Sequence, residues 1–161
     1  MAYFVDPSPS AGLPGEVHTS QLNDLGAIRK MNDGSEYIYL AGCSSCVAGS
    51  VVLFRPVAFT AILVASGLKG SVAVSTGAVN TATKYGWFFL SGEYTQAVHL
   101  GSAIASNVAL FIGGVSGQID DTAVKGDQIF NAFVRNALGA DGSIVLHLNR
   151  AFVGPSNEST G

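Results

Sequence analysis

Two cysteines three positions apart are the first residues whose type and spacing could do chemistry. Cys43 and Cys46 form the motif C-S-S-C, and a lone C-x-x-C is either a redox pair or half of a zinc site. A zinc site needs two further ligands, but His18, His99 and His147 are widely spaced and there is no second C-x-x-C. A redox pair favours a helix after the first cysteine, whereas this motif falls between two strand-like runs. The sequence therefore predicts two small buried side chains in a turn.

Carboxylates cluster once, where Asp120 and Asp121 are adjacent and Asp127 comes six residues later. A calcium loop uses oxygen ligands at alternating positions, and adjacent aspartates on a regular strand cannot both point at one ion. Hydrogen bonds between these side chains and turn backbone explain them more simply. The sequence also lacks a G-x-S-x-G motif, and no phosphate-binding lysine comes after the glycines of 113–117. We therefore predict no enzymatic activity, no catalytic residues, no cofactor and no metal.

Two glycine corners lead into apolar stretches and raise the question of a paired site. "VKGDQIFNAF" spans 124–133 and "VAGSVVLF" spans 47–54, with matching valines and with Gly126 matching Gly49. Glycine permits backbone conformations that other residues resist, and an aspartate beside it can bond to its own turn. We interpret both corners as β-turns, with the side chain of Asp127 tying its own turn. The match fits an internal duplication into two weakly related halves, and it fits chance equally well.

Short apolar runs separated by glycine, aspartate, asparagine and serine dominate the chain from residue 36 onward. Alternation of β-branched or aromatic residues with small polar ones is typical of strands. Segment 128–139 is ambiguous, because Ile129 and Phe133 fit helical spacing and also share a strand face with Asn131; we favour the strand. Strands are predicted within 36–42, 50–55, 59–66, 70–79, 85–100, 107–114, 126–134 and 142–153. The predicted fold is mainly β, a small β-barrel or β-sandwich of about seven to nine short strands.

The first 24 residues differ in composition from the rest of the chain. Pro7, Pro9 and Pro14 fall within eight positions and favour extended or turn backbone, and few apolar residues come after Val5. We therefore predict an extended arm over 1–24 and a single β domain over 25–161. Within that boundary region, 20–31 is either a short helix or the lead into the first strand.

Charge is scarce along the whole chain. Only 12% of the 161 residues are charged, compared with about 25% in an average soluble domain. Mean hydropathy is +0.38. Such a chain either enters a membrane or buries much of its surface against partners. The longest stretch without a formal charge, 94–119, contains four glycines and several polar residues, so it does not predict a membrane span.

The sequence also disfavours two classes of protein, namely proteins that carry a signal peptide and proteins that bind nucleic acid or membranes. Residues 1–15 have neither a basic region nor a long apolar core, so we expect no signal peptide. The net charge is −3 and the eight basic residues are scattered, so we expect neither a nucleic-acid partner nor a membrane partner. What remains is an obligate oligomer or a component of a larger assembly.

Four aromatic side chains lie close together in the sequence, at Tyr85, Trp87, Phe88 and Phe89. Such a cluster could line a ligand groove. More often it fills a core or a subunit interface, because aromatic side chains bury large areas in both. We therefore predict that these residues belong to the core or to a subunit interface.

Two blocks of sequence carry a resemblance to a known family. The segments "YGWFFLSG" (85–92) and "DDTAVKGDQI" (120–129) are its most specific parts, and it extends from about residue 25 to about residue 154. The chain resembles the small capsid-decoration (cement) proteins of tailed bacteriophages. The C-S-S-C motif departs from that pattern, because small or hydroxyl residues are expected there, which argues further against a redox role for Cys43 and Cys46.

The resemblance implies a mainly β protein without catalytic residues. It implies a homotrimer bound to the major capsid protein on the exterior of the mature head, made in the host cytoplasm and stabilising the shell. An arm that orders on binding fits this function. The candidate contact residues in the arm are Tyr3, Phe4, Val5, Pro7, Pro9, Leu13 and Pro14. The alternatives are a head-fibre or tail attachment component, a carbohydrate-binding β-barrel that uses Trp87 and nearby tyrosines, and a small hydrolase with an unrecognised site.

Overall fold

The computed structural model describes residues 12–136 and 144–154, and these ranges contain strands and turns but no helix. The mainly β prediction is confirmed. Eleven strands are present in the described ranges rather than seven to nine, because several are only two or three residues long. None of the described residues forms a helix long and apolar enough to cross a membrane. The strands are β1 (Val17–His18), β2 (Ile28–Lys30), β3 (Glu36–Ala41), β4 (Val51–Phe54), β5 (Ala61–Leu63), β6 (Gly70–Ser75), β7 (Tyr85–Tyr94), β8 (Leu110–Ile112), β9 (Ile119–Asp120), β10 (Gln128–Val134) and β11 (Leu146–Val153).

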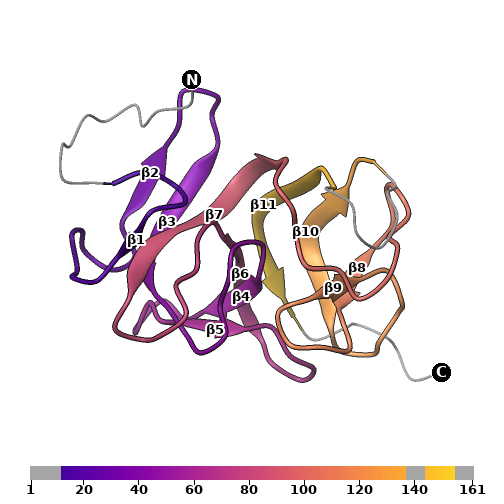
Figure 1. Cartoon of the computed structure of the whole chain (residues 1–161). Helices are drawn as coiled ribbons and strands as arrows, with labels where there is room; N and C mark the ends of the chain where they lie inside the picture. The colour runs from indigo at the N-terminus through magenta and orange to yellow at the C-terminus, as the bar shows by residue number, and fades with distance from the viewer. Residues whose placement is uncertain (1–11, 137–143, 155–161) are drawn as a thin grey trace.

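All eleven strands belong to one antiparallel sheet (Figure 1). Its main path runs β2-β3-β7-β6-β11-β10-β8-β9, while β1 pairs with β7 and the β4–β5 hairpin pairs with β6. The sheet does not close into a ring, so the finer prediction of a barrel or sandwich stays a prediction. Strands distant in sequence meet along this path, which brings side chains from both ends of the chain onto shared faces.

Strand β7 is the centre of the sheet. It pairs with β3 along one edge and with β1, β6 and β11 in succession along the other. Its side chains alternate between faces, so Trp87 packs with Tyr39, whereas Phe88 packs with Ile38 in a separate cluster. Phe89 joins the largest cluster, which is built mainly from β6, β8, β10 and β11. Consecutive aromatic residues of one strand therefore hold three parts of the core together.

The described part of the predicted arm is not separate from the sheet. Strand β1 pairs with β7, and the Gly15 backbone N–H donates a hydrogen bond to Thr76 Oγ1 at 2.9 Å. His18 is buried, and its Nδ1 lies 2.8 Å from the hydroxyl of Tyr39. The boundary at residue 24 was predicted from composition alone. A strand of two residues, such as β1, leaves no periodic pattern in the sequence that would have indicated it. Residues 1–11 lie outside the described residues.

Paired bulges shape the hairpin of β10 and β11. The register shifts between Phe130 and Ala132, at Asn131, whose φ is 59°, and Arg150 opposite has a φ of 47°. An extra residue reverses the alternation beyond it. The expectation that Ile129 and Phe133 share one strand face is wrong. Ile129 is buried in the core, whereas Phe133 is 37% exposed on the other face.

Candidate functional site

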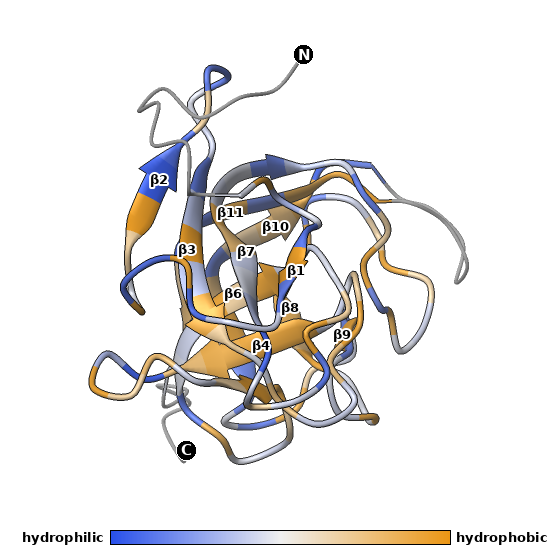
Figure 2. Cartoon of the chain, turned by 60° about the vertical axis from the view of Figure 1, so that its left-hand side comes forward, coloured by the Kyte–Doolittle hydropathy of each residue, from blue (hydrophilic) through white to orange (hydrophobic). Residues whose placement is uncertain are grey.

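Cross-strand pairing lines up side chains of four strands in one row that runs from the buried Phe54 to the exposed Phe152. Phe54 of β4 pairs with Ser71 of β6, which pairs with Phe152 of β11, which in turn pairs with Phe130 of β10. Partners in an antiparallel register point to the same face. Four strands separated by up to about a hundred residues therefore contribute to one surface. Figure 2 shows that β4 and β6 are among the most hydrophobic parts of the ribbon.

The outer aromatic face, defined as Phe130, Phe133, His147 and Phe152, lies at the β10–β11 end of this row. The rings of Phe130 and Phe152 stack with centroids 5.3 Å apart, and those of Phe133 and His147 with centroids 4.6 Å apart. Phe152 is 42% exposed. Aromatic side chains are enriched at protein interfaces because each removes a large apolar area from water. The bulges place both pairs on one side, so this face has the composition of a contact surface.

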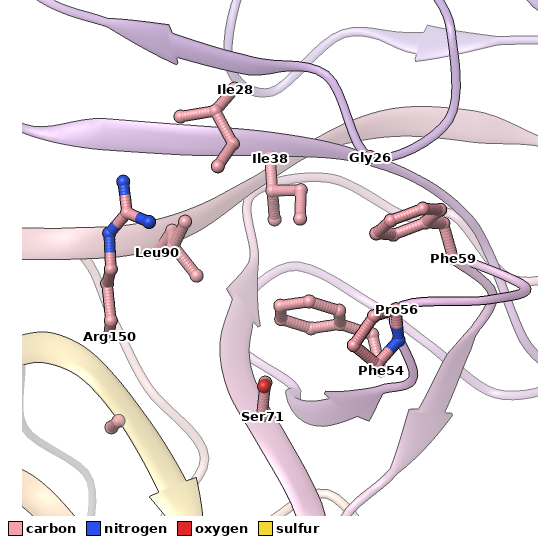
Figure 3. Close-up of a pocket in the computed structure, with 10 residues that line it drawn as sticks. Gly26, Ile28, Ile38, Phe54, Pro56, Phe59, Ser71, Leu90 and Arg150 are labelled. Carbon is pink, nitrogen blue, oxygen red and sulfur yellow. The ribbon is translucent and has the colours of Figure 1, made fainter.

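A cavity of about 330 Å³, here called the hairpin pocket, is lined by the β2–β3 hairpin and by strands β4, β6, β7 and β11 (Figure 3). Its wall is mainly aliphatic and aromatic. Arg150 stands at one side and Phe59 at the other (Figure 3). Pockets of this kind, apolar with a few polar groups, are typical binding sites. The lining residues are Gly26, Ile28, Ile38, Phe54, Pro56, Phe59, Ser71, Leu90, Arg150 and Ala151.

Two cations share one carboxylate at the Arg150 side of the pocket. The Arg150 guanidinium donates from Nε and Nη2 to Glu36 Oε2, at 3.0 and 2.9 Å. Lys30 Nζ lies 3.3 Å from Glu36 Oε1. Burial by itself would raise the pKa of Glu36, but the hydrogen bonds and charges of Arg150 and Lys30 hold it below its ordinary value. The three groups together carry one net positive charge at the pocket rim.

Phe59 forms the opposite wall in a strained conformation. Its φ is 47°, which is uncommon for a bulky side chain and costs about 1–3 kcal/mol. The ring lies directly against Gly26, where an added Cβ would be 2.6 Å from the ring atoms. Gly26 itself has a φ of 83°. The wall therefore depends on a glycine both for its backbone conformation and for the space that the ring occupies.

The predicted contact residues fall partly outside the described residues. Tyr3, Phe4, Val5, Pro7 and Pro9 all belong to residues 1–11. Leu13 is 48% exposed, and the neighbouring Pro14 is partly buried. Both lie just before β1, on the segment that packs against the sheet.

The predicted aromatic cluster belongs to the core of this chain. Trp87, Phe88 and Phe89 are fully buried, and Tyr85 is partly buried beside them. Side chains without exposed area cannot contact a second subunit or a sugar. The exposed aromatic surface is made instead by residues of β10 and β11 that the sequence analysis did not select.

The two cysteines lie in a turn, as the sequence indicated. The Cys46 backbone N–H donates to the Cys43 carbonyl at 3.2 Å, with Ser45 in the left-handed region at a φ of 63°. Cys43 is partly exposed and Cys46 is buried. A hydrogen bond from the Cys46 thiol lowers the pKa of Cys43 to about 7, and the same contact raises the pKa of Cys46. The contact between the two thiols therefore favours deprotonation of Cys43 over that of Cys46.

The clustered aspartates bond to separate loops. Asp120 accepts from Ser102 Oγ and from the Thr122 backbone N–H, while Asp121 accepts from the Ala105 backbone N–H. Only the bond from the Thr122 N–H to Asp120 is the local turn bond that the sequence predicted, because Ser102 and Ala105 lie 18 and 16 residues from their partners. Within the described ranges, no group of three or more His, Cys, Asp or Glu residues is arranged to hold a metal ion.

Asp127 bonds to a distant loop, and the prediction that its side chain ties its own turn is wrong. The buried carboxylate accepts from the Gly67 backbone N–H at 2.9 Å, and Lys69 Nζ lies 3.6 Å away. Burial would raise the pKa of Asp127, but hydrogen bonds from Ser66 and Gly67 and the charge of Lys69 hold it below its ordinary value. The turn itself is closed by backbone alone, because the Asp127 N–H donates to the Val124 carbonyl.

Comparison of the chain with protein-family models, with curated proteins and with solved structures finds no match. The geometry described above is therefore the basis for assigning a function.

Proposed function

We propose that this chain is a non-enzymatic structural protein of a tailed-bacteriophage virion, which binds the outer surface of the capsid as a trimer and stabilises the mature head. The observation that carries the proposal is the outer aromatic face, a stacked aromatic surface exposed on a chain with only 12% charged residues. The likeness of segments 85–92 and 120–129 to capsid-decoration proteins supports the same function.

The proposed contact is between the outer aromatic face and the major capsid protein. Burying apolar surface is favourable by about 25 cal/mol per Å², so one small aromatic patch binds weakly by itself. Three copies joined in a trimer bind together, and avidity then raises the overall affinity without any new contact. A decoration protein of this kind needs a modest contact surface on each copy and a firm association between copies.

Mixing the purified chain with undecorated heads, assembled from the major capsid protein of the same genome, tests the proposal directly. We expect co-sedimentation that saturates at about three copies per local three-fold position. Decorated heads should also withstand higher temperature than bare heads, because a ligand that binds only the assembled shell stabilises it. Absence of binding to mature heads would overturn the proposal.

Substitutions on the surface identify which face of the protein contacts the head. Replacing Phe133 and Phe152 together by serine should weaken head binding about tenfold or more, because both rings lose their contact area. Val57→Ser is the matched control, since Val57 is 96% exposed in the β4–β5 loop and lies outside the outer aromatic face. Equal loss from both variants would show that the contact lies elsewhere.

Removing residues 1–11 tests the predicted contacts of the arm. This boundary leaves β1 and its pairing with β7 intact, whereas a cut at residue 20 would delete a strand. We expect a folded chain with weaker binding to heads. Unchanged decoration would remove Tyr3 to Pro9 from the proposed contacts.

Electron microscopy of labelled protein separates this function from its nearest alternative. A head-fibre or tail attachment component would bind one vertex or the tail, whereas a decoration protein covers the shell. The carbohydrate-binding alternative relied on Trp87, which is fully buried.

A further inference from the structure

We infer that the hairpin pocket receives residues 3–6 of a neighbouring copy of this chain, with Phe4 against the apolar wall and the Asp6 carboxylate at Arg150. The inference rests on the proposed assembly of copies and names the contact that joins them. It is based on the chemical fit between the hairpin pocket and the side chains of residues 3–6.

The pocket combines an apolar wall with an unbalanced positive charge. Ile38, Phe54 and Phe59 supply aliphatic and aromatic surface, and Figure 3 shows the two phenylalanine rings on the side away from Arg150. At the other side, Arg150 and Lys30 share the single carboxylate of Glu36. The Arg150 side chain is still 57% exposed, so its guanidinium can donate hydrogen bonds to a second carboxylate. The pocket thus fits an apolar side chain that lies close to an acidic one.

Residues 3–6 have that composition in the required order. Tyr3, Phe4 and Val5 are consecutive large apolar residues, and Asp6 is the first acidic residue of the chain. Asp6 precedes Pro7, which favours extended backbone at Asp6. In an extended segment, side chains two positions apart share a face and lie about 7 Å apart. Phe4 and Asp6 would therefore enter the two sides of the pocket together.

The start of the described chain favours a neighbouring copy over the same copy. An added Cβ at Gly12 would lie 2.4 Å from His18 Nε2, and His18 stacks on Tyr39. Tyr39 and Ile38 are adjacent in β3 and therefore point to opposite faces, and only Ile38 lines the pocket. Gly12, the first described residue, therefore lies on the face away from the pocket. Phe4 is eight residues before Gly12, so an extended segment lets it reach about 26 Å from that point, away from its own pocket and toward a neighbouring copy.

Local backbone geometry also supports a binding function for the pocket. The bulge at Arg150 directs its side chain across the sheet to Glu36, and bulges commonly redirect side chains at functional sites. The strained Phe59 holds the opposite wall. Strain of this kind persists where the surroundings require it, and binding sites are a common place for it.

Photo-cross-linking of the full chain tests the inference. Phe4 is replaced by p-benzoylphenylalanine, the purified protein is irradiated, and cross-linked peptides are identified by mass spectrometry. We expect cross-links to segments 26–38 and 54–59. A link between copies yields covalent dimers and trimers on a denaturing gel, whereas a link within one copy leaves a monomer. Monomeric products, links to other segments or no cross-link would each overturn the inference.

Two matched substitutions check that the pocket is the acceptor. Ile28→Glu places a charge in the pocket wall and should lower the yield of covalent dimers about tenfold. Ile62→Glu is the control, because Ile62 is 44% exposed on β5, against 42% for Ile28 on β2, and does not line the pocket. Asp6→Asn should lower the yield about two- to fivefold, as expected for an exposed ion pair. Equal yields from both isoleucine variants would place the acceptor elsewhere.

The outcome is separable from that of the proposed function. Heads that are decorated by a protein without these cross-links would contradict the inference alone. Cross-linked trimers that do not bind heads would contradict the proposed function alone.

Discussion

Two turns of this protein share a backbone conformation and differ in the residue after the glycine. In turns 47–50 and 124–127 the fourth residue donates its N–H to the first carbonyl, at 3.0 and 3.1 Å, and the third residue is a glycine with a φ of 85°. Ser50 then accepts from Val47 in its own turn, whereas Asp127 reaches Gly67 and Lys69. The glycine thus specifies the turn conformation. The side chain after it determines whether a hydrogen bond forms within the turn, as at Ser50, or to a distant loop, as at Asp127.

The largest predicted effect separates the two glycines. An added Cβ at Gly49 would lie 2.4 Å from the Ala97 carbonyl oxygen, whereas at Gly126 the nearest atom is Lys69 Nζ at 3.7 Å. Gly126→Ala should cost about 1–2 kcal/mol of unfolding free energy, from backbone strain alone. Gly49→Ala adds a backbone clash and should cost about 3 kcal/mol or more. Urea unfolding of both variants measures the difference. Equal losses of unfolding free energy would show that the atoms around the two glycines do not affect the cost of the substitution.

The second prediction concerns the long-range bond. Asp127→Ala leaves the Gly67 N–H without its acceptor and should cost about 2–3 kcal/mol, because hydrogen bonds to charged groups contribute more than neutral ones. Asp127→Asn keeps an acceptor of the same shape and should cost about 1 kcal/mol. Thermal unfolding compares the two. A neutral effect of Asp127→Ala would mean that the loop 66–69 does not depend on this carboxylate.

The third prediction uses pH to isolate the same carboxylate. The folded state holds the pKa of Asp127 below its ordinary value of 3.8, so its contribution to stability is present above pH 3.8 and is lost as pH falls through the folded pKa. Asp127→Asn removes this dependence. The stability difference between the two proteins should therefore be constant near neutrality and shrink below about pH 4. A difference that grows on acidification has the opposite sign and would contradict the assignment.

The smallest effect is expected at the local turn. Ser50→Ala removes the acceptor of the Val47 N–H. Because Val47 is exposed, this N–H can form a hydrogen bond with water instead. The loss should be about 0.5–1 kcal/mol. Denaturant midpoints of this variant and of Asp127→Ala, measured side by side, sharpen the comparison. A larger loss at Ser50 than at Asp127 would reverse it.

Local pattern was enough to predict the strands but not their partners. Alternation indicated mainly β structure, and the left-handed glycines of both turns are expected from residue type. The bond from Asp127 to Gly67 could not be predicted, because the partner lies 60 residues away and is a backbone N–H. The pairing of Val17 and His18 with β7 could not be predicted for a related reason, since β1 is too short to show a period.

The candidate surface was harder to predict than the strands. A regular strand would place Phe130 and Phe133 on opposite faces, and only the bulge at Asn131 brings them together. The hairpin pocket takes its wall from six strands and two loops, so no single segment shows it. One signal was present: phenylalanines occupy positions in β10 and β11 that a half-buried strand normally fills with polar residues.

The central position of β7 has a consequence for synthesis of the chain on the ribosome. One edge of β7 is completed only by β11, whose pairing residues are Leu146 to Asn149. After β7 is complete at Tyr94, its last neighbour therefore does not exist until Leu146 to Asn149 have been synthesised. Proteins dominated by such distant pairings fold slowly, and unpaired strand edges promote aggregation. Nascent chains of this protein are thus expected to need protection until β11 has been synthesised, and chains truncated before Leu146 to accumulate as insoluble material.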